Sequence, residues 1–252
     1  MLEGRVALIT GAASGQGRAA AVRFASHGAS IAIADIDDEG SAQTAAMVES
    51  EGAKAITIHA DVSRRADCEA MVAACASAFG RLDVLYNNAA IQMSGRLLDC
   101  SEEDWDRTIA TNLDAVFWTC RAALPVMLEG DGGSIINTAS VLGLIGSEGY
   151  VAYGAAKAGL VALTRQIAVE YGPRVRANVI APGSIDTPRF RKVAEAMDDT
   201  DGFLTGLTRV IPLQRLGTAE DVAGIALFLA SDLSAYVSGA VIPADGGLAA
   251  LR

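Results

Sequence analysis

The feature that most constrains the fold is a regular alternation of short apolar runs with longer amphipathic segments. The short runs are rich in β-branched residues and have strand length, whereas the longer segments have helical length and spacing. Strands that alternate with helices pair in parallel, so the pattern predicts an α/β chain with a parallel sheet between helices. We expect strands at Arg5–Thr10, Ser30–Ala34, Ala55–His59, Leu82–Tyr86, Ser134–Thr138, Val175–Ile180 and Ala240–Pro243, and helices near residues 15–30, 38–51, 63–80, 101–129 and 149–171 and from Thr218, as the N-cap, to Leu229.

The alternation continues to about residue 184 without a linker, a low-complexity tract or an internal repeat, which predicts a single domain spanning residues 1–252. The next segment, residues 184–217, is less regular and contains Pro188 and Pro212. An irregular segment of this length in a compact domain is more often a functional lid than a scaffold. We therefore expect residues 184–217 to cover a substrate site.

The charge of the chain limits its partners. A formal net charge of -10 disfavours nucleic acid and anionic membrane surfaces, which require basic protein surfaces. No apolar run approaches the roughly 18 to 20 residues of a membrane helix, so we expect a soluble, cytoplasmic protein. The 4 cysteines lack metal-ligand spacing and the chain has only 2 histidines, so we expect neither a metal site nor disulfides.

A glycine-rich turn follows the first expected strand. The sequence T-G-A-A-S-G-Q-G places Gly11, Gly15 and Gly17 between this strand and the next helix. Such glycines let the backbone approach a pyrophosphate, which then meets the free N–H groups of the helix. Asp35 closes the second strand about 20 residues further on, where a carboxylate can accept hydrogen bonds from the adenosine ribose. The turn alone is weak evidence, but together the two features predict a dinucleotide site.

Asp35 also favours NAD over NADP, because a carboxylate repels the 2′-phosphate of NADP. The residues that follow it, Ile36, Asp37 and Asp38, offer no positive charge. Arg18 is the one nearby basic residue that leaves NADP open, although it is also what an ordinary surface helix would carry.

A second motif lies between Ser140 and Lys157. In a helix that begins near Gly149, Tyr153 and Lys157 stand at i and i+4 on one face. A nearby ammonium group favours the phenolate and lowers the pKa of a tyrosine, which makes it a better base. Ser140, at the expected end of a strand, could offer a hydroxyl to the same reacting oxygen. The spacing Y-x-x-x-K also arises by chance, so it needs support from the rest of the chain.

In the order of these motifs the chain resembles the single-domain short-chain dehydrogenase/reductase family from about Gly4 to Gly247. The family's N-N-A-G element becomes Asn87-Asn88-Ala89-Ala90. Its last glycine is replaced by Ala90, which we expect to cost backbone freedom. The resemblance implies a Rossmann-like, doubly wound parallel sheet with helices on both faces and a nicotinamide cofactor. The implied cofactor residues are Thr10, Gly11, Ser14, Gly15, Gln16, Gly17, Asp35, Ile36, Asp61, Val62, Asn88, Ala89, Ala90, Tyr153, Lys157, Pro182, Gly183, Ile185 and Thr187.

The catalytic set implied by the resemblance is Asn112, Ser140, Tyr153 and Lys157. In the family Lys157 would also bond the nicotinamide ribose, and Asn112 would help to hold a proton-relaying water. The implied activity is reversible NAD-dependent oxidation of a secondary alcohol to a ketone, with Tyr153 as general acid/base. Tyr150 matches the Y-x6-K spacing of enoyl reductases in the same superfamily, but Ser140 favours Tyr153.

Two alternatives stay open: a 3-oxoacyl or other carbonyl reductase of the same family and, more distantly, a non-catalytic NAD-sensing protein. We expect a small alcohol or ketone as substrate and, from the resemblance, a homotetramer. The candidate substrate residues favour neither a sugar nor a lipid; they are Ser140, Gln92, Leu142, Tyr150 and Ser184.

Overall fold

The apolar runs form one parallel sheet in the computed structural model, which describes residues 1–251. Its strands are β1 (Val6–Thr10), β2 (Ser30–Asp35), β3 (Ala55–His59), β4 (Val84–Asn87), β5 (Gly133–Thr138), β6 (Val175–Pro182) and β9 (Val241–Ala244). They lie in the order β3-β2-β1-β4-β5-β6-β9. The order reverses direction between β1 and β4, which is where ligands bind in open α/β sheets. Every residue of β1 is buried, as expected for a strand covered on both faces.

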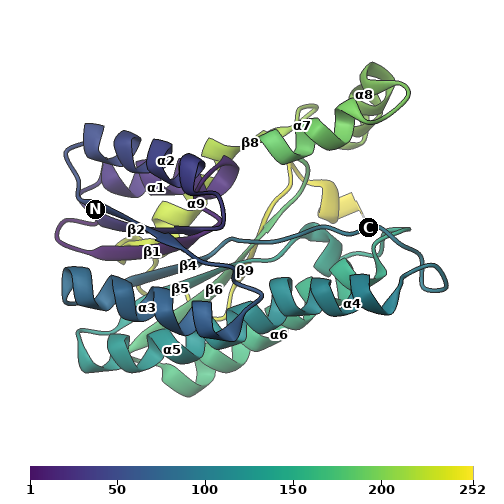
Figure 1. The fold of residues 1–252 in the computed structure, drawn as a ribbon. Helices are drawn as coiled ribbons and strands as arrows, with labels where there is room; N and C mark the ends of the chain where they lie inside the picture. The colour runs from purple at the N-terminus through teal and green to yellow at the C-terminus, as the bar shows by residue number, and fades with distance from the viewer. Residues whose placement is uncertain (252) are drawn as a thin grey trace.

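Helices cover both faces of the sheet (Figure 1). One face carries α1 (Gly15–Ala25), α2 (Asp38–Ser50) and α9 (Ala219–Ala230), whereas the other carries α3 (Arg65–Phe79), α5 (Ala115–Glu129) and α6 (Val151–Tyr171). Each face has its own apolar core, and the sheet separates the two. The predicted Rossmann-like, doubly wound fold is therefore confirmed.

The helix expected over residues 101–129 is interrupted. It consists of α4 (Glu102–Ile109), a π-helical turn at Ala110–Asp114, and then α5. A π-turn inserts a residue into the helical repeat and is frequent at functional sites. The first helix also ends earlier than expected, at Ala25, because the chain turns back through Gly28 into β2.

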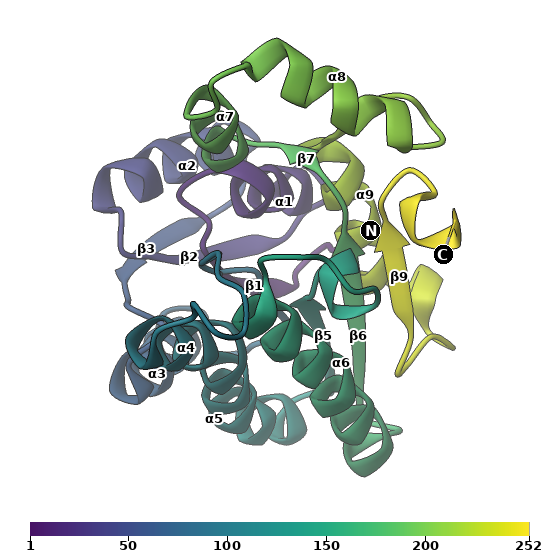
Figure 2. The same ribbon diagram turned by 90° about the vertical axis from the view of Figure 1, so that its right-hand side faces the viewer.

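Residues 184–217 are more ordered than expected. They contain α7 (Pro188–Glu195) and α8 (Thr200–Val210), flanked by β7 (Ile185–Asp186) and β8 (Gly217–Thr218). Figure 2 shows α7 and α8 together at one end of the molecule, apart from the layered helices. The Thr187 side chain caps α7 by accepting from the backbone N–H of Phe190, and Asp199 caps α8 in the same way. No residue of α8 is buried, so this helix adds nothing to the two apolar cores beside the sheet.

The C-terminal helix α9 begins at the predicted cap. Thr218 and Asp221 form a reciprocal capping box, in which each side chain accepts from the other residue's backbone N–H. The apolar residues of α9 are mostly buried against α1, so this run is explained by the core.

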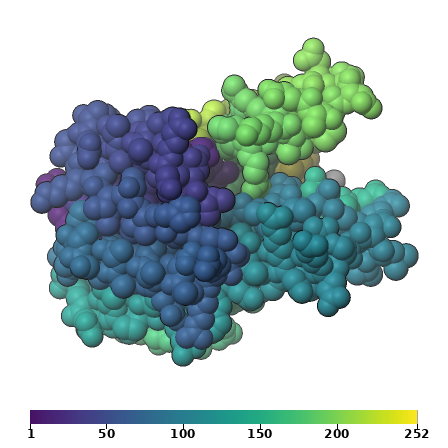
Figure 3. All heavy atoms as spheres, viewed as in Figure 1, coloured from purple at the N-terminus to yellow at the C-terminus, as the bar shows by residue number. Residues whose placement is uncertain are grey.

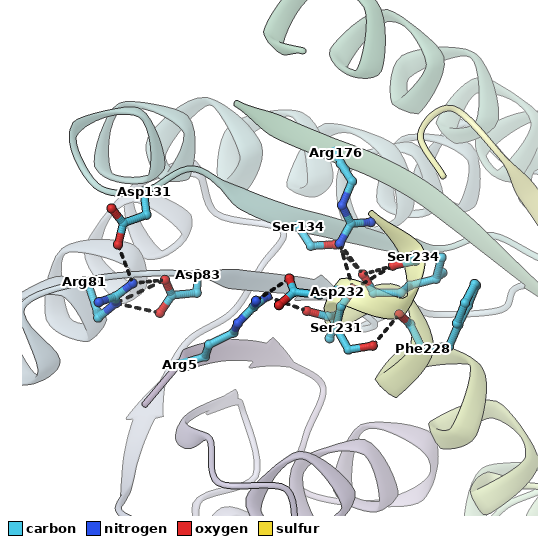
Figure 4. Close-up of polar contacts among 12 residues, drawn as sticks. Arg5, Arg81, Asp83, Asp131, Ser134, Arg176, Phe228, Ser231, Asp232 and Ser234 are labelled. Atoms are coloured by element: carbon cyan, nitrogen blue, oxygen red, sulfur yellow. Dashed lines mark hydrogen bonds and ion pairs between the residues drawn. The ribbon is translucent and has the colours of Figure 1, made fainter. Parts of the chain in front are cut away.

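Polar groups fasten the sheet at the end where its strands begin (Figure 4). Asp83 accepts a hydrogen bond of 2.8 Å from the backbone N–H of Val6 and is paired with Arg81. On β6, Arg176 donates to the carbonyl of Leu229 at 3.0 Å, and Ser134 on β5 donates to the same carbonyl at 2.7 Å. These contacts hold β1 and α9 to the sheet and leave the opposite end, where the strands finish, free for ligands.

Among the described helices, none has the length and apolar character needed to cross a membrane.

Candidate active site

A cleft of about 720 Å³ opens where β1, β4, β5 and β6 end. Its walls are the glycine-rich turn, the ends of these strands, the start of α6, and the helices α7 and α8. Figure 3 shows the surface hollowed between the α7–α8 segment and the part of the chain that includes α4. The volume is in the range of cofactor and ligand sites.

Most of the predicted site residues line this cleft. They are Gly11, Ser14, Gly15, Gln16, Asp35, Ile36, Asp61, Val62, Asn88, Ala89, Ala90, Gln92, Ser140, Leu142, Tyr150, Tyr153, Lys157, Pro182, Gly183, Ser184, Ile185 and Thr187. Three predicted residues, Thr10, Gly17 and Asn112, lie behind its wall instead. Their side chains and backbone hold neighbouring segments in place.

The glycine-rich turn packs too closely for larger residues. A Cβ on Gly17 would lie 2.3 Å from the carbonyl oxygen of Gly11, and one on Gly11 would lie 2.8 Å from the Cα of Ala89. The turn is fastened to the end of β4 by the Thr10 hydroxyl, which accepts from the backbone N–H groups of Asn88 and Ala89 at 3.0 and 3.1 Å. Thr10 and Gly17 therefore shape the turn from behind.

Asp35 lines the cleft and also orders the turn. One of its carboxylate oxygens accepts from the backbone N–H of Ala13 at 2.9 Å, and the other accepts from that of Asp37 at 3.1 Å. Its position at the end of β2 is thus fixed by hydrogen bonds on both sides.

Arg18 does not line the cleft. Its guanidinium donates to the Thr44 hydroxyl at 2.9 Å, to the carbonyls of Ala13 and Gly40, and to the Gln43 side chain. These contacts tie α1 to α2. The guanidinium of Arg18, the one basic group near Asp35 in the sequence, is therefore already hydrogen-bonded to acceptors of the protein.

The turn retains groups that suit a dinucleotide. The side-chain oxygen Oε1 of Gln16 is buried, lies in the cleft wall and has no hydrogen-bond partner among residues 1–251.

Ala90, in place of the family glycine, is accommodated without strain, because Gln214 is the only non-glycine residue of the described chain with a positive φ. The backbone conformation at this position is therefore one that alanine adopts as readily as other residues.

Tyr153 and Lys157 lie on the buried face of α6, where β5 ends. The Lys157 ammonium is fully buried, donates to the carbonyl of Thr138 at 2.7 Å, and lies 5.7 Å from the centroid of the Tyr153 ring. Burial, with a smaller contribution from the positive charge of Arg189, lowers the pKa of Lys157 to about 7.

The electrostatics of Tyr153 differ from the prediction. Burial raises the pKa of its hydroxyl, and this effect exceeds the lowering by the charge of Arg189 and by the hydrogen bond with Ser140. The i, i+4 spacing brings the two side chains together, but their common burial decides the direction of both pKa shifts.

The two candidate tyrosines differ in their surroundings. Tyr153 is buried and close enough to Ser140 for the serine side chain to lower its pKa, whereas Tyr150 is half-buried and precedes the first residue of α6. Both line the cleft, but Tyr153 is the one that meets the serine.

Asn112 lies in the π-helical turn and is fully buried. Its side chain accepts from the backbone N–H of Ile91 at 2.9 Å and donates to the carbonyl of the same residue at 2.8 Å. Ile91 lines the cleft, so Asn112 fixes one wall through a pair of hydrogen bonds.

Arg189 is not among the individually predicted site residues, although it belongs to the segment 184–217 that we expect to cover the substrate site. It lies in the first turn of α7, reaches across the cleft, and donates to the carbonyl of Ala90 at 2.7 Å and to the Gln92 side chain at 3.3 Å. Apolar side chains of α7 and α8 also line the cleft, and two of them, Phe190 and Phe203, stack with centroids 6.3 Å apart. The Thr187-Pro188 pair, a cap followed by proline at the first helical position, is the sequence signal that could have located this helix.

Known proteins match this chain along nearly its full length. A family model described as "Enoyl-(Acyl carrier protein) reductase" matches residues 11–249. The 3-oxoacyl-[acyl-carrier-protein] reductase FabG of Thermotoga maritima is 42% identical over 248 residues, 98% of each chain. An uncharacterized short-chain type dehydrogenase/reductase of Sinorhizobium fredii is 42% identical over 254 residues, again 98% of each chain. The crystal structure of a levodione reductase superposes with a TM-score of 0.96 at 37% identity, covering 100% of both chains. With its glycine-rich turn, its serine–tyrosine–lysine cluster and these matches, the chain belongs to the short-chain dehydrogenase/reductase family, oxidoreductases that bind a nicotinamide cofactor.

Proposed function

We propose that the protein catalyses the reversible, NAD-dependent oxidation of a secondary alcohol to a ketone. The observation that carries this proposal is that Ser140, Tyr153 and Lys157 line the same cleft as the glycine-rich turn. A reacting group and a dinucleotide could therefore meet there without a rearrangement of the fold.

A bound nicotinamide supplies the hydride acceptor in the oxidation and the hydride donor in the reduction. Tyr153 takes the proton of the substrate hydroxyl and returns it in the reverse direction. Ser140, which lines the same cleft and acts on the Tyr153 hydroxyl, holds the same oxygen. Lys157 provides a positive charge beside the tyrosine when it is protonated, and Asn112 acts through Ile91 by fixing the wall of the site.

Two variants test the role of Tyr153. We expect Tyr153→Phe to lose turnover by at least about 10²-fold, the usual size of a general acid–base contribution, while dinucleotide binding measured by calorimetry is retained. Tyr150→Phe is the matched variant, because it removes a hydroxyl from the same cleft. If Tyr150→Phe loses turnover and Tyr153→Phe does not, the catalytic tyrosine is Tyr150 and the Y-x6-K spacing applies.

NAD is favoured as the cofactor by Asp35 and by the contacts of Arg18. The Asp35 carboxylate is held at the adenosine end of the cleft, where it would repel a 2′-phosphate. The Arg18 guanidinium is occupied by acceptors of α2 and the glycine-rich turn. We expect kcat/KM to be higher with NAD than with NADP, and Asp35→Ala to reduce this ratio by about tenfold, since one unfavourable charge contact near a surface is worth about 1 to 2 kcal/mol. A wild-type preference for NADP would contradict the assignment.

Reduction of a 3-oxoacyl or another carbonyl substrate is the second candidate, favoured by the similarity to the 3-oxoacyl reductase of Thermotoga maritima. The same residues serve this direction, so assays with ketone and reduced cofactor separate it from alcohol oxidation. Enoyl reduction, suggested by the description of the family model, is tested by adding an enoyl thioester to the panel. Tight NADH binding without turnover of any alcohol, ketone or enoyl substrate would instead favour the NAD-sensing protein.

We also propose that residues 184–217 cover the bound substrate, since several of them line the cleft.

The last proposal is that the protein is a homotetramer. Apolar side chains are left in solvent on α5 and α6 and beyond α9: Phe117 is 41% exposed, Val169 81% and Tyr236 fully exposed. Light scattering after size-exclusion chromatography gives the number of subunits, and a monomer at micromolar concentration would contradict this assembly.

A further inference from the structure

Charged side chains are unevenly distributed along the cleft. The carboxylates that line it, Asp35 and Asp61, lie at the adenosine end, next to the glycine-rich turn and the end of β3. The catalytic end is lined by Lys157 and Arg189, with Arg107 from α4 at an exposed position. None of the described residues that line the catalytic end is acidic.

Arg189 differs from the other arginines near this segment in having only neutral partners. Arg191, on the same helix, forms a two-pronged ion pair with Asp186 at 2.6 and 2.8 Å. Arg215 is paired in the same way with Asp221. Arg189 instead contacts the Ala90 carbonyl and the Gln92 amide, and no carboxylate among residues 1–251 forms an ion pair with it.

The guanidinium of Arg189 lies close to the reacting position. Arg189 lines the same cleft as Tyr153 and Lys157, and its positive charge lowers the pKa of both groups, so it lies near the hydroxyl that would take the substrate proton. A planar guanidinium is suited to bind a carboxylate through two parallel hydrogen bonds. A carboxylate held there would lie in the same cleft as the carbinol carbon and close to it, as in a 2- or 3-hydroxy acid.

We propose that Arg189 is a specificity-determining residue that binds a carboxylate of the substrate, so that the preferred substrates are 2- or 3-hydroxy acids and the corresponding oxo acids. This inference rests on the proposed alcohol oxidation. The remaining lining from α7 and α8 is apolar and suits a hydrocarbon part on the far side of the carbinol; it consists of Pro188, Phe190, Val193, Phe203, Leu207 and Val210.

A purely structural role for Arg189 makes a different prediction. Its bond to Ala90 joins α7 to the segment after β4, so the side chain could simply hold α7 over the cleft. A side chain that only holds α7 would aid all substrates equally, whatever their charge. The ratio of kcat/KM between an acid and its neutral ester therefore separates the two roles.

The first experiment compares 3-hydroxybutyrate with methyl 3-hydroxybutyrate, and 2-hydroxybutyrate with its methyl ester, in the full-length protein with NAD. For at least one pair we expect the wild type to prefer the acid by about tenfold, the lower end for hydrogen bonds to charged groups, because Arg189 is exposed to solvent. Arg189→Met should abolish this preference and Arg189→Lys should keep part of it. Lys192→Met is the matched control, since it removes one positive charge from the same helix outside the cleft, and should keep the full preference.

The second experiment measures binding without turnover. Acetoacetate is titrated into the protein saturated with NAD, where no hydride is available for reduction, and the heat of binding is recorded. We expect Arg189→Met to weaken this binding by about tenfold and Lys192→Met to leave it unchanged.

Two results would overturn the inference: an equal loss for acid and ester in Arg189→Met, or a wild type that turns over neutral alcohols and no hydroxy acid. Absence of turnover with every substrate would instead refute the proposed alcohol oxidation. In that event the acetoacetate titration still decides the role of Arg189, because it needs no chemistry.

Discussion

Replacing Asn112 by alanine tests whether this residue holds the cleft wall as well as serving catalysis. The side chain makes two hydrogen bonds to the backbone of Ile91, at 2.9 and 2.8 Å, and is itself fully buried. The variant removes both partners at once and leaves the backbone N–H and C=O of Ile91 without them.

The size of the effect follows from these two groups. Leaving a withdrawn backbone donor or acceptor unpaired costs about 1 to 3 kcal/mol. Ile91 is half-buried, so water can partly replace the lost contacts and the lower half of this range applies to each group. We therefore expect Asn112→Ala to lower the free energy of unfolding by about 2 to 4 kcal/mol in total. We also expect a fall in kcat/KM, because Ile91 lines the cleft.

Urea unfolding followed by tryptophan fluorescence and circular dichroism measures this loss. Thr119→Val is the control: it removes a buried hydroxyl one to two turns further on, whose hydrogen bond of 2.7 Å goes to the carbonyl of Ala115 in the same helix. That carbonyl belongs to the helical ladder, so we expect the control to cost less than about 1 kcal/mol. A free energy of unfolding of Asn112→Ala within about 0.5 kcal/mol of the wild type would refute the argument, and Asn112 would then act in catalysis alone.

Three further predictions concern the buried lysine, the glycine-rich turn and the polar contacts of the sheet. Burial lowers the pKa of Lys157 to about 7, against 10.5 when unfolded, so between these values the unfolded chain binds more protons and the free energy of unfolding rises with pH. The free energy of unfolding of the wild type minus that of Lys157→Met should therefore increase from pH 7 to pH 9, by at most about 1.4 kcal/mol per pH unit. Parallel curves for the two proteins would contradict this. Gly17→Ala places a Cβ 2.3 Å from the Gly11 carbonyl oxygen, so we expect calorimetry to show that dinucleotide binding is weakened by more than about tenfold. Gly206→Ala is the control, because a Cβ at this position of α8 meets open space, and this variant should bind the dinucleotide as the wild type does. Asp83→Ala leaves the buried N–H of Val6 unpaired and Arg81 without its main partner, and should lower the free energy of unfolding by about 2 to 3 kcal/mol in urea; a change below about 0.5 kcal/mol would show that water replaces the carboxylate.

The sheet, the glycine-rich turn and the Tyr153–Lys157 pair could be predicted because each depends on neighbours in the sequence. A central parallel strand such as β1 is a continuous apolar run, since both faces are buried. The i, i+4 spacing brings Tyr153 and Lys157 to one face of any helix that contains them. Parallel strands all end at the same edge, so the residues that follow them meet at the cleft.

Other features depend on contacts between distant segments, which the local sequence pattern does not indicate. The helix over 101–129 gives an uninterrupted pattern, yet Asn112 lies in a π-turn, where its side chain bonds Ile91 from the segment after β4. Helices α7 and α8 are short, with 8 and 11 residues, and they lie in a segment that contains Pro188 and Pro212, so this segment was predicted to be irregular.

The sequence by itself determined the fold, the family and the identity of the residues at the end of β5 and the start of α6. Only the tertiary structure decided the charge environment of that site, because burial and the distances between groups set a pKa, and neither is encoded in spacing. It reversed the expected shift for Tyr153 and brought Arg189 from α7 to Ala90 across the cleft. Arg189 is far from Tyr153 in the sequence and lies on α7, in which only Ala194 is buried, yet the fold places its charge at the catalytic end of the cleft.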